Sequence, residues 1–345
     1  MAKMHRTSWP FFLPVSAEDP DDLTSGWSML QPLKTHGIDP GIMLVVRGGR
    51  NGFIGEAALQ QQKNIGRFVT SYGNADIIVM LSNFPLAEMD WLHHAKQATD
   101  HVRAGIDFAS HLPISGKKSI TFHLNALCDK KEFRARSMQA WRQRFEDIRP
   151  ALAALTQEAQ HRECSLLVEK VPVTELGDVP PQDERVYRQT RLRDLRNPWY
   201  LTAHWGIPEL KKNGLGTVLD LCHMRALLHS THEDAEAAGI FPEDIPLLKF
   251  RTLLNEVIDL EKTDLVHLND GRGMWKKTGG VFEEGVSLGE GDIRELPQII
   301  QFLRKHRIPT VLEVNDQGDF TKRPASTRSL TFLQQCLAAT PPLTS

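Results

Sequence analysis

Short apolar runs alternate along the chain with longer stretches in which apolar residues recur at helical spacing. The runs have the length of buried strands, and the stretches between them are typical of amphipathic helices. We expect eight strands, at residues 9–15, 41–47, 75–81, 119–125, 165–168, 217–220, 265–268 and 310–314. A helix is expected after each strand, at about 21–36, 56–72, 86–110, 131–162, 199–212, 246–261, 293–306 and 327–337.

This regular alternation predicts an α/β protein with a parallel sheet, and eight such units predict a closed (β/α)8 TIM barrel. The 345 residues accommodate a barrel of about 250 residues together with insertions, which we expect after strands five and six, at 171–200 and 229–245. An open doubly wound sheet is the alternative. Residues 1–345 show no linker and no internal repeat, so we expect a single domain.

Four of the predicted strands end in a side chain that can bind a metal ion. These residues, on strands five to eight, are Glu169, Asp220, His267 and Glu313. Two positions before each of them, with the same strand parity, stand the apolar residues Leu167, Val218, Leu265 and Val311, which would fill the barrel interior.

In TIM barrels the active site lies at the C-terminal ends of the strands, so the four polar residues should converge. Three carboxylates close together either have raised pKa values or require a cation. An oxygen-rich set with one nitrogen suits one divalent metal ion: Mn²⁺, Co²⁺, Mg²⁺ or Zn²⁺. The alternative is four unrelated strand-end residues that make structural hydrogen bonds.

Composition narrows the function further. The formal net charge is -2, which gives no sign of nucleic-acid affinity in the chain as a whole. The four cysteines show no CxxC pair, which fits a reducing compartment and argues against a cysteine-based zinc site. No apolar run approaches the roughly 20 residues of a membrane span, and the N-terminus makes a poor signal peptide. We therefore expect a cytoplasmic protein with no membrane partner.

Several weaker features remain open. His123 and Asn125 share a strand parity at the end of the fourth strand, which favours a place in the pocket. The glycines Gly289 and Gly291 form a turn before a helix, although their amides could instead meet a phosphate. The arginines at 185–196 suggest a lid that binds phosphate or a nucleic-acid backbone, or, as the simpler reading, a charged helix face or partner surface.

The order and spacing of the motifs resemble the xylose isomerase-like barrel superfamily, which includes endonuclease IV, sugar epimerases, inosose dehydratases and hydroxypyruvate isomerases. The elements that carry the resemblance are Glu169, Asp-Leu-Cys-His at 220–223, His-Leu-Asn-Asp at 267–270, Leu-Gly-Glu-Gly-Asp-Ile at 288–293 and Leu-Glu at 312–313. Endonuclease IV uses three zinc ions, and two of its histidine ligands are missing here. This chain has Ser82-Asn83 and Glu283-Glu284-Gly285 at those places.

The resemblance implies a single metal site formed by the four strand-end residues, as in the isomerase and epimerase branch. The implied activity is isomerisation or epimerisation of a sugar, polyol or related carbohydrate derivative, by proton transfer next to an oxygen that the metal holds. Glu169 and Glu313 would be the catalytic acid and base. His223 would hold a substrate hydroxyl, and Arg272 an oxyanion or hydroxyl. His123 and Asn125 would line the pocket, unless His123 helps to hold a second metal beside Glu169.

Two other functions stay open. One is an endonuclease IV-like phosphodiesterase that acts on abasic DNA with a reduced metal set, for which the arginine-rich segment would supply a basic groove. The other is a barrel that works as a non-catalytic scaffold. Barrels of this kind often pair, so a homo-oligomer is a further expectation.

Overall fold

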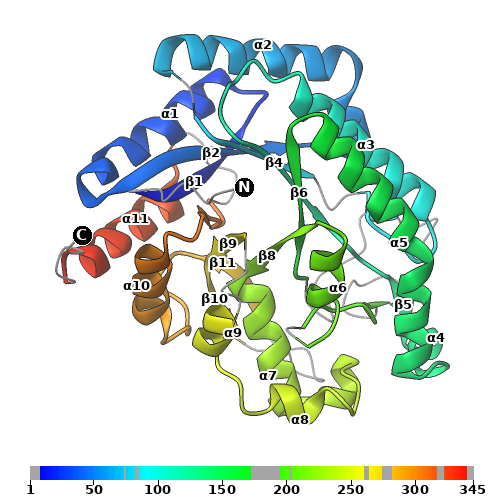
Figure 1. Cartoon of the computed structure of the whole chain (residues 1–345). Coiled ribbons are helices and arrows are strands. Elements are labelled where there is room, and N and C mark those ends of the chain that lie inside the picture. The colour runs from blue at the N-terminus through cyan, green and yellow to red at the C-terminus, as the bar shows by residue number, and fades with distance from the viewer. Residues whose placement is uncertain are drawn as a thin grey trace.

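A closed barrel of parallel strands forms the centre of the chain. The computed structural model describes residues 8–73, 75–81, 85–171, 195–202, 204–259, 264–273, 282–316 and 322–339. The barrel strands follow the order β1-β12-β9-β8-β6-β4-β3-β2 (Figure 1). Their bounds are Trp9–Ser16 (β1), Ile38–Val46 (β2), Ile77–Leu81 (β3), Lys118–His123 (β4), Cys164–Glu169 (β6), Gly216–Asp220 (β8), Leu265–Leu268 (β9) and Thr310–Leu312 (β12). The predicted TIM barrel is therefore confirmed, and the open sheet is excluded.

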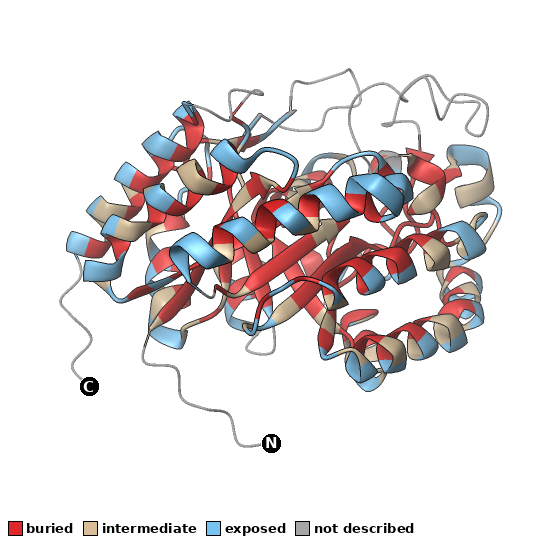
Figure 2. Cartoon of the chain, turned by 90° about the horizontal axis from the view of Figure 1, so that it is seen from above, coloured by how far each residue is buried: buried red, intermediate tan, exposed pale blue. Residues whose placement is uncertain are grey.

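Helices surround the barrel, with their inner faces buried and their outer faces exposed (Figure 2). The α-helices are Pro20–Leu30 (α1), Gly55–Tyr72 (α2), Ala95–Ser110 (α3), Lys130–Arg134 (α4), Met138–His161 (α5), Ile207–Lys212 (α6), Leu221–Ala238 (α7), Ile245–Leu248 (α8), Leu253–Asp259 (α9), Leu296–His306 (α10) and Pro324–Ala338 (α11). Short 3₁₀ helices lie at Gln31–His36, Gly49–Phe53 and Leu86–Glu88. No helix in the described ranges is long and apolar enough to cross a membrane.

A compact apolar cluster fills the barrel interior. It comprises Phe12, Met43, Ile78, Leu167, Val218, Leu265 and Val311. The four interior residues predicted from strand parity are all in this cluster. Because side chains two positions apart face the same way along a strand, the polar residues that follow them point into the mouth of the barrel.

The helix predicted at 86–110 is wrong in its first third. Only Leu86–Glu88 is helical there, as a 3₁₀ turn, and α3 begins at Ala95. The carboxylate of Asp90 accepts the backbone N–H of Leu92 at 3.0 Å, which favours a turn over a helix. Beside it, the Trp91 N–H donates to the carbonyl of Asn125 at 2.8 Å, so this segment pairs with the end of β4.

Three further predicted helices have different bounds in the structure, and the one expected at 246–261 is divided into α8 and α9. The helix expected at 131–162 is divided into α4 and α5, where Ser137 caps α5 by accepting the Ala140 N–H. Pro150 lies inside α5 and does not end it. The helix expected at 199–212 begins only at α6, because Gly206 precedes it with a φ of 80°.

The insertions after strands five and six also differ from expectation. The second insertion, predicted at 229–245, begins inside a helix, since α7 runs to Ala238 and ends at Gly239 with a φ of 90°. Of the first insertion, residues 172–194 lie outside the described residues. Its end forms β7 (Leu195–Arg196), which pairs with β5 (Cys128–Asp129). Between the seventh strand and α10, β10 (Asp270–Gly273) pairs with β11 (Phe282–Val286) as an antiparallel hairpin.

A buried ion pair joins the start of α1 to the residue that precedes α11, and these two helices follow the first and last barrel strands. The Arg323 Nε donates to Asp22 Oδ1 at 3.1 Å, and the other oxygen of Asp22 accepts the Ser16 N–H at 2.6 Å. Arg323 and Asp22 are 2% and 1% exposed at their side chains. Since β1 and β12 pair directly, this contact secures the seam where the barrel closes.

We predict that Asp22→Asn lowers the free energy of unfolding by about 3 kcal/mol, because it leaves a buried guanidinium without its carboxylate. Denaturant unfolding measures this change. Asp21→Asn, in the same helical turn but exposed, is the matched control and should shift stability by no more than about 0.5 kcal/mol. Equal effects of the two substitutions would mean that the seam does not depend on the ion pair.

Candidate metal centre

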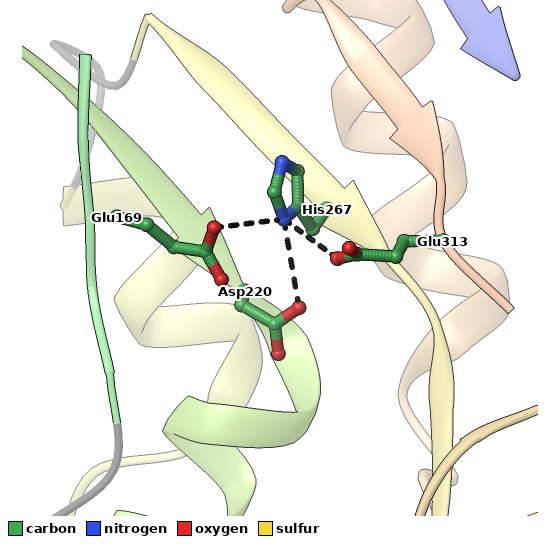
Figure 3. Close-up of side chains that lie close together, drawn as sticks. All are labelled: Glu169, Asp220, His267 and Glu313. Atoms are coloured by element: carbon green, nitrogen blue, oxygen red, sulfur yellow. Dashed lines mark ion pairs between the residues drawn. The ribbon is translucent and has the colours of Figure 1, made fainter. Parts of the chain in front are cut away.

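Four side chains from neighbouring strands meet at the C-terminal mouth of the barrel. Glu169 ends β6, Asp220 ends β8, His267 lies on β9, and Glu313 follows β12 (Figure 3). The Nδ1 atom of His267 lies 2.7 Å from a Glu313 oxygen, 3.5 Å from a Glu169 oxygen and 3.8 Å from an Asp220 oxygen. One ligand atom from each residue lies within 4.8 Å of all the others. The structure thus brings together the predicted set.

Burial makes the charges in this cluster interact strongly. Glu169, Asp220 and His267 are buried, and the side chain of Glu313 is 26% exposed. Burial opposes the imidazolium form of His267, but the carboxylates of Glu313 and Glu169 outweigh it and hold the pKa of His267 well above its ordinary value. Burial, with the Glu313 and Glu169 carboxylates adding to it, raises the pKa of Asp220 to about 6.

The pKa of Glu169 is shifted in the opposite direction to that of Asp220. Burial alone would raise its pKa, but the neighbouring imidazoles of His123 and His267 hold the pKa of Glu169 well below its usual range. This carboxylate therefore stays ionised, and a proton on His267 offsets only part of the negative charge of the cluster. A divalent cation would take over that role.

Hydrogen bonds fix the orientation of Asp220. Its Oδ2 accepts the side-chain amide of Asn269 at 2.7 Å, and its Oδ1 accepts the His223 N–H at 2.8 Å as the N-cap of α7. The Asn269 oxygen in turn accepts the Cys222 N–H at 3.0 Å. Asp220 is thus held by the start of a helix on one side and by the residue after β9 on the other.

Two further histidines approach the carboxylate of Glu169. His123 Nε2 lies 3.1 Å from one Glu169 oxygen, and His223 Nδ1 lies 3.3 Å from the other. His223 Nδ1 also lies 3.0 Å from the Lys170 carbonyl. Because a carbonyl can only accept, this nitrogen carries the proton, and His223 Nε2 faces the half-exposed Glu284, 4.0 Å away. Both histidines therefore lie beside Glu169.

The other predicted pocket residues lie differently. Asn125 is buried two residues beyond His123, and its amide nitrogen makes no hydrogen bond to the described part of the chain. Arg272 is exposed on the hairpin, where it donates to the Glu290 carbonyl at 2.7 Å and lies 3.5 Å from Glu283. The structure does not bring Arg272 to the cluster. Arg185, Arg188, Arg191 and Arg193 lie outside the described residues.

Asp270 organises the turn at Gly289 and Gly291. Its two oxygens accept the backbone N–H groups of Gly271, Gly289, Gly291 and Ile293 at 2.8–3.2 Å. These amides are thus used inside the protein, which confirms the turn and removes the phosphate alternative. Sequence reasoning missed Asp270 and Asn269 as supporting residues, although the His-Leu-Asn-Asp motif that contains them was recognised.

The comparisons with known proteins give a fold and no close relative. No family model and no curated protein sequence matches the chain. A solved L-ribulose 3-epimerase is 13% identical, with a TM-score of 0.56 over 96% of this chain and 95% of that chain. A D-tagatose 3-epimerase-like protein is 15% identical, with a TM-score of 0.55 over 95% and 97%. A xylose isomerase domain protein from Planctomyces limnophilus is 13% identical, with a TM-score of 0.54 over 97% and 100%.

The chain has the xylose isomerase-like TIM-barrel fold. The resemblance seen in the motifs is confirmed at this level. At identities of 10–16% the likeness extends to the fold and leaves the reaction open.

The cluster at the mouth of this xylose isomerase-like barrel fits a divalent cation. Glu169 Oε2 and both ring nitrogens of His267 are buried and make no hydrogen bond of acceptable geometry within the described residues. Buried polar atoms without partners are costly, and a metal ion would satisfy Glu169 Oε2 and His267 Nδ1. Glu169, Asp220, Glu313 and His267 Nδ1 would be its ligands, an oxygen-rich set suited to Mn²⁺, Mg²⁺, Co²⁺ or Zn²⁺.

We predict that metal binding releases protons. His267 must lose its proton to become a ligand, and its raised pKa means that the proton is present at neutral pH. Calorimetry in buffers of different ionisation enthalpy should detect about one proton released per metal ion, and the affinity should fall as the pH is lowered. Binding without proton release would contradict this charge balance.

We also predict that Asn269→Leu weakens metal binding by about 10–100-fold, because Asp220 loses the amide that orients it. Competition with a fluorescent chelator gives the affinity. Asn213→Leu is the matched control: the Asn213 amide donates one hydrogen bond as well, to the Glu209 backbone carbonyl at 2.8 Å, but this residue precedes β8 at the opposite end of the barrel. An unchanged affinity in Asn269→Leu would show that Asp220 is oriented without it.

Proposed function

We propose that the chain is a divalent-metal-dependent isomerase or epimerase that acts on a sugar, polyol or related carbohydrate derivative. The observation that carries this proposal is the convergence of Glu169, Asp220, His267 and Glu313 at the mouth of a xylose isomerase-like barrel. Solved structures named as sugar epimerases share this fold over nearly the whole chain, which supports the same choice.

Proton transfer is assigned to the two outer members of the cluster. In the barrel order β12-β9-β8-β6, Glu313 and Glu169 belong to the flanking strands and lie on either side of His267 (Figure 3). A bound divalent cation would polarise a carbon–oxygen group of the substrate and make the adjacent C–H bond more acidic. Glu169 and Glu313 would then take a proton from one face of that carbon and return a proton to the same carbon.

The surroundings of Glu169 suit a base. Its pKa is held low, so it is ionised at neutral pH, and His123 and His223 contact one oxygen each. His223 is fixed through the Lys170 carbonyl, and its Nε2, on the side of Glu284, would donate to a substrate hydroxyl. The unpaired amide of Asn125 offers a further donor.

The opposite side of the barrel mouth is apolar. Val45 on β2 and Met80 on β3 are neighbours in register, pack on the interior cluster and remain partly exposed. In the barrel order, β2 lies across from β8 and β3 across from β9. Val45 and Met80 would thus offer apolar contacts opposite the polar metal-binding side, which suits a carbohydrate, whose hydroxyl edges and C–H faces differ in the same way.

The phosphodiesterase alternative has weaker support. His123 beside Glu169 would suit a second metal ion, but the hairpin places Glu283 and Glu284 near the mouth, where carboxylates repel a phosphate backbone. The glycine amides that could have met a phosphate are bound to Asp270.

We predict that the metal-loaded protein catalyses deuterium uptake from D₂O into a carbon-bound position of at least one sugar in a panel of ketoses, aldoses and polyols. Mass spectrometry and NMR detect the exchange. Glu169→Gln and Glu313→Gln should each slow it by about 10²-fold or more, since each removes a proton-transfer group. Circular dichroism and elemental analysis check that fold and metal content survive.

Glu158→Gln, on the outer surface of α5 beside Arg103, is the control and should leave the rate unchanged. Full turnover in both active-site variants would overturn the assignment of the acid–base pair. Two or three zinc ions per chain, together with cleavage of abasic DNA, would favour the phosphodiesterase. Absence of bound metal even after reconstitution would favour the scaffold.

A further inference from the structure

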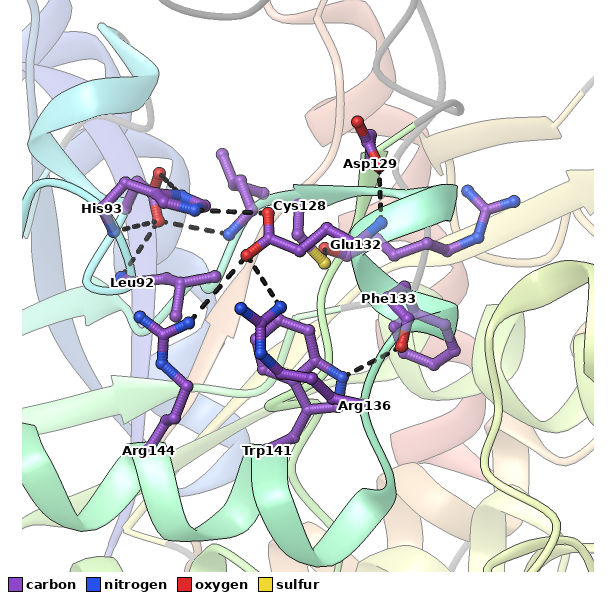
Figure 4. Close-up of polar contacts among 12 residues, drawn as sticks. Leu92, His93, Cys128, Asp129, Glu132, Phe133, Arg136, Trp141 and Arg144 are labelled. Atoms are coloured by element: carbon purple, nitrogen blue, oxygen red, sulfur yellow. Dashed lines mark hydrogen bonds and ion pairs between the residues drawn. The ribbon is translucent and has the colours of Figure 1, made fainter.

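A second cluster of charged side chains lies beside the barrel mouth, outside the candidate metal centre. His93, in the loop before α3, stands between two carboxylates (Figure 4). Its Nδ1 lies 3.1 Å from Asp90 Oδ2, and its Nε2 lies 3.4 Å from Glu132 Oε2 on α4. Asp90 is fully buried, whereas the side chain of His93 is 37% exposed.

Asp90 connects this cluster to the end of β4. Its Oδ1 accepts the N–H groups of Leu92 at 3.0 Å and of Leu127 at 3.2 Å, so it joins the loop before α3 to the segment after β4. In the same loop, the indole Nε1 of Trp91 donates to the His123 carbonyl at 3.2 Å. The backbone around Asp90 and Trp91 also pairs with Asn125. This loop therefore contacts the backbone of both predicted pocket residues, His123 at the end of β4 and Asn125 just after it.

We propose that His93 is a positioning residue: by bridging Asp90 and Glu132, it ties the loop before α3 to α4 around the end of β4 and so sets the position of His123 and Asn125. The role of those two residues in substrate binding rests on the proposed function, but the bridge itself does not. Within the described residues, His93 contacts Asp90 and Glu132 and none of the four candidate metal ligands.

The bridge requires both ring nitrogens to donate. A carboxylate can only accept, so an imidazole between two of them needs two N–H groups, and only the imidazolium form has both. A neutral ring would donate to one carboxylate and direct a lone pair at the other. The bridge therefore holds with the proton on His93 and loses one of its two contacts without it.

The surrounding charges set how firmly the proton is held. The Asp90 hydrogen bond, which outweighs the effect of burial, together with Glu132 raises the pKa of His93. Glu132 itself contacts two arginines (Figure 4). Arg136, in the turn before α5, lies 3.1 Å away, and Arg144, on α5, lies 3.9 Å away. The other titratable or charged groups near the cluster are His94, Cys128 and Asp129.

The direction of the pH dependence follows from the sign of this shift. A histidine with a raised pKa in the folded state contributes its stabilisation fully below its ordinary pKa of 6.5 and loses it as the pH rises through the raised value. The bridge is thus intact below pH 6.5 and opens as the pH rises through the raised pKa of His93.

NMR spectroscopy of the full-length protein tests the proposal without any substrate. The indole N–H signal of Trp91, assigned with Trp91→Phe, reports the contact with the His123 carbonyl. We expect this signal to shift with pH at the midpoint of the His93 imidazole, above 6.5. In His93→Gln the shift should vanish, and in Glu132→Gln the midpoint should fall toward 6.5 because one carboxylate has lost its charge.

His111→Gln is the matched control, since His111 also lies beside a carboxylate, Asp107 at 3.8 Å, but at the other end of α3. It should leave the Trp91 titration unchanged. The proposal is overturned if the Trp91 signal stays constant while His93 titrates, or if its titration persists in His93→Gln. Neither result depends on turnover. The His93 proposal can therefore fail while the proposed function stands, and the proposed function can fail while the His93 proposal stands.

Discussion

Repulsion among three carboxylates at one end of a barrel is the constraint on which the rest of the structure depends. Parallel strands end at the same rim, so Glu169, Asp220 and Glu313 are brought together by the fold itself. Their charges must be balanced inside protein, where water screens them poorly. His267 is at the centre of the three, and its Nδ1 faces all of them, which makes the cluster a place where a proton and a divalent cation compete.

Several residues around the cluster have two structural roles at once. Asp220 is a candidate ligand and also the N-cap of α7, so the start of a helix and the shape of the metal centre share one carboxylate. Asp270 closes the turn before α10 with four backbone hydrogen bonds, next to the residue that orients Asp220. Local folding and site geometry are therefore coupled, and substitutions at such positions alter both.

The parts of the fold that could be predicted from the sequence are those determined by the local pattern of apolar and polar residues. Strand-length apolar runs predicted all eight barrel strands, and parity placed Leu167 and Val218 inside and Glu169 and Asp220 at the mouth. What it missed depends on contacts between distant segments. Asp90 breaks a helical pattern because it binds backbone of its own loop and of residue 127, and no local signal reveals that partner. Arg272 follows the recognised His-Leu-Asn-Asp motif and was therefore predicted to bind substrate. The hairpin of β10 and β11 instead directs its side chain toward Glu290.

The seam between β1 and β12 has a consequence for how the chain reaches this structure. The strands from β1 through β2, β3 and β4 to β6 pair in the order in which they are made, but the last pairing joins residues about 300 positions apart, as Trp9 and Thr310 are across the seam. Such non-local contacts form slowly, because the entropy of closing a long loop is lost before the contacts contribute any stabilisation. Until β12 emerges from synthesis, the curved sheet has two open edges, at β1 and at its growing end, and Glu313 is not yet in place. Barrel closure and completion of the metal centre are therefore the same late event, and an incomplete chain exposes its strand edges and lacks a full ligand set at the same time.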